Sequence, residues 1–182
     1  SLLGNGQADL LIGGRGRDTL RGGEGTDRLI GYDPGRGIGA AVADPGNTLD
    51  GGAGADTLLG GRGADRLAGG AGDDFLAPFR GADTVIGGPG AADEVGYATR
   101  SSDVVVNLFA GATREDGDPN DRIFGVEIVR TGAGDDRIVA TAADETLVAG
   151  AGDDSVFAGA GSDALVGRRG ADQLSGGAGD DV

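Results

Sequence analysis

A nine-residue repeat runs through most of this sequence. Residues 51–77 read GGAGADTLL, GGRGADRLA and GGAGDDFLA, three consecutive copies of Gly-Gly-x-Gly-x-Asp-x-Leu-x. A strict period of this kind predicts a solenoid whose units stack on one another, because a disordered glycine-rich linker has no reason to keep a fixed spacing. The chain holds 41 glycines among 182 residues. That content favours a backbone shape that side chains would forbid.

The repeat forms two blocks. The first covers residues 1–96, with a degenerate insertion at 31–41, and the second covers residues 131–182 and ends inside a repeat. In the insertion Ile38 keeps position eight, but Arg36 stands at position six, where we expect no metal site. The other position-six residues are Asp9, Asp18, Asp27, Asn47, Asp56, Asp65, Asp74, Asp83, Asp93, Asp136, Glu145, Asp154, Asp163, Asp172 and Asp181.

Each repeat predicts one very short strand followed by a turn. The three residues around position eight are the only strand-like stretch, and the glycines beside them permit positive φ. Two strands and two turns make a coil of about 18 residues, twice the repeat. Because neighbouring side chains of a strand point to opposite faces, position eight faces inward and positions seven and nine face water.

Residues 97–130 interrupt the repeat and form a bridge between the blocks. The segments SDVVVNLFAG, residues 102–111, and DRIFGVEIV, residues 121–129, are β-branched and are predicted as strands. The intervening segment ATREDGDPND is predicted as an acidic loop. In this bridge Asp116, Asp118, Asn120 and Glu127 have EF-hand-like spacing. The glycine of that motif is replaced by Asp121 and Pro119 intrudes, so an extra calcium ion and a solvated loop both stay open.

The carboxylates predict a cation between adjacent coils. Parallel strands lie about 4.8 Å apart, so Asp56 and Asp74 face each other across that distance. Two calcium–oxygen bonds of about 2.3–2.6 Å span the same gap. Zinc and copper favour His or Cys, and the chain has neither. Magnesium demands a tighter octahedron. We therefore expect several Ca²⁺ ions, with glycines at positions one, two and four turning carbonyls toward them.

Cations are also expected to hold the fold together. One leucine per nine residues returns less free energy than ordering those residues costs, and stacked aspartates repel one another. We predict that the calcium-free chain is largely disordered and that metal binding and folding are one event.

The pattern resembles the RTX family, the hemolysin-type calcium-binding repeats of bacterial proteins exported by type I secretion. The resemblance implies an all-β fold, a right-handed parallel β-roll with Ca²⁺ between turns. It implies the carboxylate pairs Asp9–Asp27, Asn47–Asp65, Asp56–Asp74, Asp65–Asp83, Asp136–Asp154, Asp154–Asp172 and Asp163–Asp181. The predicted metal residues also include Gly52, Gly54, Gly61, Gly63, Gly70, Gly72, Gly150, Gly152, Gly159 and Gly161. Arg36 opposite Asp18 would abolish one site, and Glu145 opposite Asp163 is a departure in the turn.

Charge and composition exclude several functions. The formal net charge is −15, which disfavours nucleic acid and anionic membranes as partners. No apolar run is long enough to span a membrane. Without His or Cys there is little for acid–base or thiol catalysis. Our hypothesis is a non-catalytic, calcium-dependent folding module of a larger extracellular, secreted bacterial protein, whose other domains carry any catalysis. The alternative is an accessory module that binds polysaccharide or a cell surface.

Overall fold

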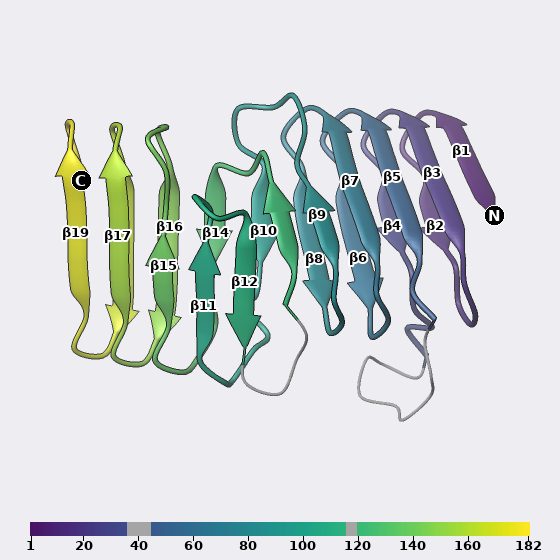
Figure 1. The fold of residues 1–182 in the computed structure, drawn as a ribbon. Helices are drawn as coiled ribbons and strands as arrows, with labels where there is room; N and C mark the ends of the chain where they lie inside the picture. The colour runs from purple at the N-terminus through teal and green to yellow at the C-terminus, as the bar shows by residue number, and fades with distance from the viewer. Residues whose placement is uncertain (36–44, 116–119) are drawn as a thin grey trace.

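The computed structural model describes residues 1–35, 45–115 and 120–182, and every element named in it is a β-strand (Figure 1). The strands form two layers, an 11-stranded sheet, here called sheet A, and an 8-stranded sheet, here called sheet B. The two ends of the chain lie at opposite ends of the stack (Figure 1). In these described residues, no helix is long and apolar enough to cross a membrane.

Sheet A takes every odd-numbered strand up to β9 and carries an extra pair in the bridge. Its order is β1 (Leu2–Gly6), β3 (Thr19–Glu24), β5 (Thr48–Ala53), β7 (Arg66–Ala71), β9 (Thr84–Ile86), β13 (Arg122–Phe124), β12 (Ala112–Glu115), β11 (Val104–Asn107), β15 (Arg137–Val139), β17 (Ser155–Ala160) and β19 (Gln173–Ala178). Sheet B is regular throughout. It runs from β2 (Leu10–Ile12) through β4 (Arg28–Ile30), β6 (Thr57–Gly61), β8 (Phe75–Phe79), β10 (Glu94–Gly96), β14 (Ile128–Arg130) and β16 (Thr146–Ala151) to β18 (Ala164–Arg169).

Strands one coil apart pair in parallel and in register. Leu49 of β5 lies opposite Leu67 of β7, and Leu58 of β6 lies opposite Leu76 of β8. The offset is 18 residues, as two nonapeptides predict, because each repeat supplies one strand and consecutive strands alternate between the sheets. The predicted all-β parallel β-roll is confirmed.

Position eight builds one continuous core between the sheets. Leu20, Leu49 and Leu67 of sheet A and Leu29 and Leu58 of sheet B are completely buried. They belong to a single apolar cluster that extends into both blocks and the bridge. The inward orientation predicted for position eight is therefore confirmed.

Position nine does not always face water as predicted. Ile30, Leu59 and Ala77 occupy this position on sheet B and are buried in a second, smaller cluster. Tyr32 and Phe79 pack against that cluster, with their rings edge to face at 5.8 Å. Aromatic side chains over the outer face of the sheet thus remove these residues from solvent.

In sheet A, β3 pairs directly with β5. Thr19 of β3 lies opposite Thr48 of β5, and the prediction that Arg36 faces Asp18 falls on a residue that the structure does not describe. Asn47, directly before β5, takes that place and accepts a hydrogen bond from the Asp18 N–H at 2.9 Å. Its repeat supplies both this acceptor and an inward leucine. Arg36 and Ile38 themselves lie outside the described residues.

The bridge differs from its prediction in two elements. Ala112–Glu115, predicted as part of the acidic loop, forms β12, which pairs antiparallel with β11 and β13. The predicted strand at 121–129 is split at Gly125, φ 55°, into β13 of sheet A and β14 of sheet B. Sheet B passes through the bridge without interruption, because β14 pairs with both β10 and β16. The two blocks therefore belong to one stack.

Candidate calcium sites

The position-six side chains form two rows, one along each of the two sides of the stack on which the turns lie. The sheet-B row comprises Asp9, Asp27, Asp56, Asp74, Asp93, Glu127, Glu145 and Asp163, each directly before a strand of sheet B, and Asp181, which follows β19. The sheet-A row comprises Asp18, Asn47, Asp65, Asp83, Asp121, Asp136, Asp154 and Asp172. The two rows lie on opposite sides of the stack because the strands of the two sheets run in opposite directions, so that they begin on opposite sides (Figure 1).

One oxygen of each carboxylate ties two coils together. The N–H of Asp56 donates to Oδ1 of Asp74 at 2.8 Å, and the N–H of Asp65 donates to Oδ1 of Asp83 at 2.7 Å. All four residues are at most 3% exposed. The hydrogen bond is charge-assisted and fixes the carboxylate at the mouth of the turn. The sequence predicted the facing carboxylates but not this bond.

The second oxygen is buried and has no hydrogen-bond partner in most of the rows. This is so for Oδ2 of Asp9, Asp18, Asp27, Asp56, Asp74, Asp93, Asp136, Asp154 and Asp163 and for Oε2 of Glu145. Burying an ionised carboxylate oxygen without a partner is expensive. A row of such oxygens therefore needs either protons or cations.

The glycine at position one leaves a gap beside these oxygens. A Cβ on Gly51 would lie less than 3.0 Å from both Oδ2 of Asp56 and the carbonyl oxygen of Gly69 in the next coil. A carboxylate oxygen and a carbonyl oxygen of adjacent coils thus converge where only glycine leaves room. Hard oxygen donors of these two kinds are the ligands that Ca²⁺ prefers. The donor set fits calcium.

The ligand set must rely on the backbone. Among the described residues, no three Asp or Glu side chains gather into a cluster that could hold a metal by themselves. Two carboxylates and several carbonyls would have to share the ion. This is the composition that the repeat predicted.

Position-two and position-four glycines, which the sequence proposed as metal residues, shape the turns. Gly52 and Gly54 have φ values of 112° and 134°. A Cβ on Gly70 would collide with the carbonyl oxygen of Gly52. Carbonyls abut a glycine of the following coil in the same way at Gly54, Gly63, Gly70, Gly72, Gly152, Gly159 and Gly161. Close stacking of turns therefore requires glycine independently of any metal.

Burial makes the charged form of these carboxylates unfavourable. It raises the pKa of Asp74 from 3.8 to about 6, and it raises the pKa of Asp136 to about 6. The same cause raises the pKa of Asp56 and Asp154. Charge repulsion within the row adds to it, since Asp56 and Asp93 both raise the pKa of Asp74. A divalent cation would reverse both effects.

Every predicted carboxylate pair is brought together across adjacent coils. The linking N–H to Oδ1 distances are 2.8 Å for Asp9–Asp27, 2.6 Å for Asn47–Asp65, 2.8 Å for Asp56–Asp74, 2.7 Å for Asp65–Asp83, 2.7 Å for Asp136–Asp154, 3.1 Å for Asp154–Asp172 and 3.1 Å for Asp163–Asp181. Glu145 likewise donates its N–H to Asp163 at 2.8 Å. Asp27 also meets Asp56, a pair that the sequence missed because the insertion separates them.

Two row members in the bridge were not recognised from the sequence. Asp121 accepts the N–H of Asp83 at 2.9 Å, and Glu127 accepts the N–H of Asp93 at 3.0 Å. Both begin an acidic-x-apolar-x stretch, DRIF and EIVR, which was the available signal. Glu127 was weighed only as an EF-hand-type ligand. Its partners in that motif, Asp116 and Asp118, lie outside the described residues, and Asn120 is exposed.

At Asp121 the chain supplies the missing partner itself. The Tyr97 hydroxyl donates to Oδ2 of Asp121 at 2.8 Å, and both residues are 2% exposed. The N–H of Asp121 donates to the Thr113 hydroxyl of β12 at 3.0 Å. This rung of the sheet-A row is satisfied by hydrogen bonds from the bridge.

Comparison with known families agrees with the repeat and with the geometry. The model of the RTX calcium-binding nonapeptide repeat matches residues 3–33, 45–76, 123–156, 130–165, 139–174 and 157–182. These matches cover well over half of the chain and include members of both rows. No curated protein matches the chain. The chain thus belongs to the family of RTX calcium-binding nonapeptide repeats.

Proposed function

We propose that this chain is a non-catalytic module that folds when it binds calcium, within a larger secreted bacterial protein. The observation that carries the proposal is the row of buried carboxylate oxygens without hydrogen-bond partners. At neutral pH, a fold that buries so many unpaired anionic oxygens has a favourable free energy only if cations are present.

The residues of each turn would share the work of holding an ion. Asp56 and Asp74 offer Oδ2, and the position-one glycines Gly51 and Gly69 offer carbonyl oxygens and leave room beside them. Calcium supplies positive charge between the coils and accepts six to eight oxygen ligands. Because adjacent coils contribute to one site, ion binding stabilises their stacking.

Coupled binding and folding suits a secreted protein. An unfolded, acidic chain stays extended where calcium is scarce and folds where calcium is plentiful, since a ligand that binds only the folded state shifts the equilibrium toward it. The chain has no Cys, so its folding does not depend on disulfide formation. Export by type I secretion, into the extracellular space, follows from this proposal.

A non-catalytic role is supported by the side chains that are present. The sequence lacks His and Cys, and the buried carboxylates recur on every coil. Recurrence is expected of metal ligands, whereas an active site needs one differentiated pair. Any catalysis is assigned to other domains of the parent protein.

The decisive experiment is a calcium titration followed by circular dichroism and calorimetry. We expect a largely disordered chain after removal of calcium and a β-structured chain with several bound ions at millimolar Ca²⁺. A chain that is fully β-structured at neutral pH without calcium, and unchanged on its addition, would refute the proposal.

A matched pair of variants tests the assigned rows. Asp74→Asn keeps an Oδ1 acceptor for the Asp56 N–H but removes the charge, as Asn47 does naturally when its Oδ1 accepts the Asp18 N–H. We expect at least one fewer bound ion and a higher calcium midpoint of folding. Asp50→Asn, at a half-exposed outward position, should leave both unchanged. If the two variants bound the same number of ions with the same calcium midpoint of folding, the sheet-B row would not contribute ligands to the metal site.

A second function is favoured by the outer face of sheet A. Arg137 lies over the Phe157 ring at 4.6 Å, and Arg122 lies over the Phe124 ring at 5.9 Å. Flat aromatic rings beside cations suit an acidic polysaccharide or a cell surface. Binding of the calcium-loaded protein to immobilised acidic glycans, lost in Arg137→Gln, would support this role, and absence of binding would exclude it for the glycans tested.

A further inference from the structure

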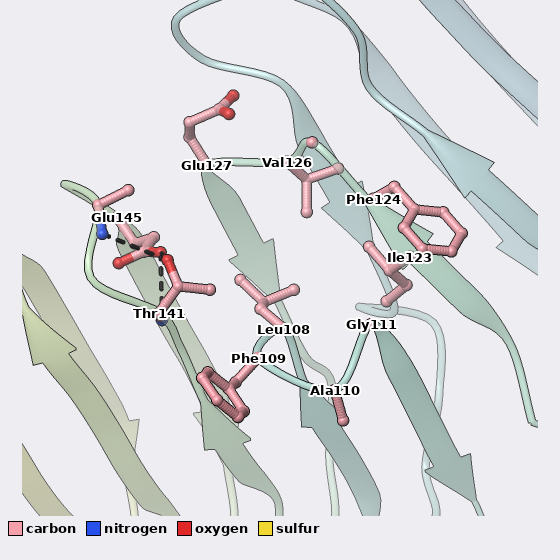
Figure 2. A pocket seen from close by; sticks show the side chains of 12 residues that line it. Leu108, Phe109, Ala110, Gly111, Ile123, Phe124, Val126, Glu127, Thr141 and Glu145 are labelled. Atoms are coloured by element: carbon pink, nitrogen blue, oxygen red, sulfur yellow. Dashed lines mark hydrogen bonds between the residues drawn. The ribbon is translucent and has the colours of Figure 1, made fainter.

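A pocket of about 410 Å³ lies where the bridge meets the second block (Figure 2). Its walls come from the turn between β13 and β14 and the turn between β15 and β16, and the turn between β11 and β12 reaches between them. Figure 2 shows Glu145 and Thr141 on one side, Ile123 and Phe124 on the other, and Leu108 between them.

The pocket follows from a mismatch between the two sheets. In sheet A, β13 and β15 are separated by β12 and β11, whereas in sheet B β14 pairs directly with β16. With strands about 4.8 Å apart, the two turns leave sheet A about 14 Å apart and reach sheet B about 5 Å apart. The turns therefore spread apart here, while turns in the regular repeats stack closely.

The sheet-B row is broken at the same place. The N–H of Glu127 donates to the Asp93 carbonyl at 3.0 Å instead of to the next carboxylate of the row. Oε1 of Glu145 accepts hydrogen bonds from the hydroxyl and the N–H of Thr141 in its own turn. Glu145 is 4% exposed, lines the pocket, and keeps Oε2 without a partner.

The lining combines two carboxylates with an apolar floor. Glu127 and Glu145 are the charged groups among the 12 lining residues, and no arginine is among them. Leu108, Ile123 and Val126 supply buried or partly buried apolar surface. The Phe109 side chain is 85% exposed. Leaving an aromatic side chain in water to this extent is unfavourable.

We propose that this pocket binds an organic cation, an ammonium or guanidinium group on an apolar stem. The positive group would lie between the two glutamates and the stem would cover Leu108 and Phe109. A bare divalent ion fits less well, because calcium needs six to eight oxygens and much of this lining is hydrocarbon. This activity goes beyond calcium-dependent folding and uses a place where the repeat pattern fails.

The test uses calcium-saturated protein and two probes, phenethylammonium and its neutral counterpart phenylethanol. We expect phenethylammonium to shift the amide NMR signals of Gly111, Gly125 and Ala143 saturably, and phenylethanol to bind at least about tenfold more weakly, since a charged hydrogen-bonded pair is worth about 1.4 kcal/mol or more. Equal binding of the two probes, or no binding of either, overturns the proposal. An N-acetylated arginine amide, titrated beside them, shows whether a free amine or a peptide side chain is the better source of the cation.

Two variants separate the pocket from general adhesion. Phe109→Ser should weaken phenethylammonium binding about threefold, as the loss of apolar contact with the stem implies, while Phe157→Ser, a half-exposed phenylalanine outside the pocket, should not. Glu145→Gln should weaken it about tenfold while the spectrum stays that of a folded chain. If Phe109→Ser binds like the wild type, or if raising Ca²⁺ above saturation displaces the probe competitively, the site is not one for organic cations. All these measurements use calcium-saturated protein, so they do not depend on whether the calcium-free chain is unfolded. This proposal can therefore fail while the calcium proposal stands.

Discussion

The regular repeat and the bridge satisfy the same kind of buried carboxylate in opposite ways. In the repeat, Oδ2 of Asp74 is buried without a hydrogen-bond partner and lies where a Cβ on Gly69 would collide with it. In the bridge, Oδ2 of Asp121 receives the Tyr97 hydroxyl. A repeat that leaves this oxygen unpaired needs a proton or a cation beside it, whereas the bridge draws the partner from its own chain. Under the proposed function, dependence on cations would therefore belong to the nonapeptide and not to the roll as such.

The largest expected effect concerns pH in the absence of calcium. Burial raises the pKa of Asp74 and Asp136 from 3.8 to about 6, so the folded state binds protons more tightly than the unfolded state. Their stabilising contribution is therefore fully present below about pH 4 and is lost as pH rises through about 6. We expect chain freed of calcium on a chelating resin to show far more β-structure by circular dichroism at about pH 4 than at neutral pH.

In that experiment the bridge reports on cooperativity. Tyr97 belongs to the core cluster that the repeats share, so the tyrosine signal in near-ultraviolet circular dichroism should change with pH together with the total β-signal. A calcium-free chain whose β-content rises with pH would contradict the assignment of the buried rows.

The second effect concerns the core that both regions share. Leu67→Ala in a repeat and Ile123→Ala in the bridge each remove a buried side chain from one continuous cluster. Each should lower the free energy of unfolding of the calcium-loaded chain by about 3 kcal/mol, since large-to-alanine substitutions cost about 2–5 kcal/mol. Denaturant unfolding should remain a single transition in both variants. Two separate transitions would show that the bridge and the repeats unfold independently.

A smaller effect is expected where the bridge replaces the cation. Tyr97→Phe removes the hydroxyl that donates to Oδ2 of the buried Asp121, while the Asp83 N–H still donates to the other oxygen. The change should destabilise the calcium-loaded chain by about 2 kcal/mol in denaturant unfolding. Tyr32→Phe is the matched control, because Tyr32 packs edge to face on Phe79 at the surface cluster. If the vacated place instead accepts an ion, calorimetry should show one additional calcium bound by Tyr97→Phe. Unchanged stability together with unchanged stoichiometry would show that the hydroxyl has no such role.

The smallest effect separates two ion pairs. In the bridge Arg130 Nε lies 2.8 Å from Glu94 Oε1 and the pair is partly buried, while in the repeats Arg21 and Asp50 are 4.0 Å apart and largely exposed. Glu94→Gln should cost about 0.5–1 kcal/mol, whereas Arg21→Gln should have no measurable effect on unfolding. A larger loss of stability in Arg21→Gln than in Glu94→Gln would contradict this ranking of the two ion pairs.

Much of this structure could be predicted because the repeat is regular. The period predicted the stacked coils, the inward residue at position eight and the facing of Asp56 and Asp74, since each depends only on spacing along a strand and between strands. The parallel roll and the other carboxylate pairs were implied by the resemblance to a family. Predictions failed at β12 and at the strand that Gly125 divides. At these places the sequence departs from the nine-residue period. Which strands pair there depends on which distant strand has backbone groups free to form hydrogen bonds.

The sequence by itself determined the repeating coil, because nine-residue spacing sets which side chains meet whatever surrounds them. Only the tertiary structure decided that Asn47 lies beside Asp18, that Tyr97 reaches Asp121, and that a pocket opens between two turns. These features depend on contacts between segments of no common period. The stability of these contacts depends on which backbone and side-chain groups the other strands leave without partners. No local sequence pattern contains that information.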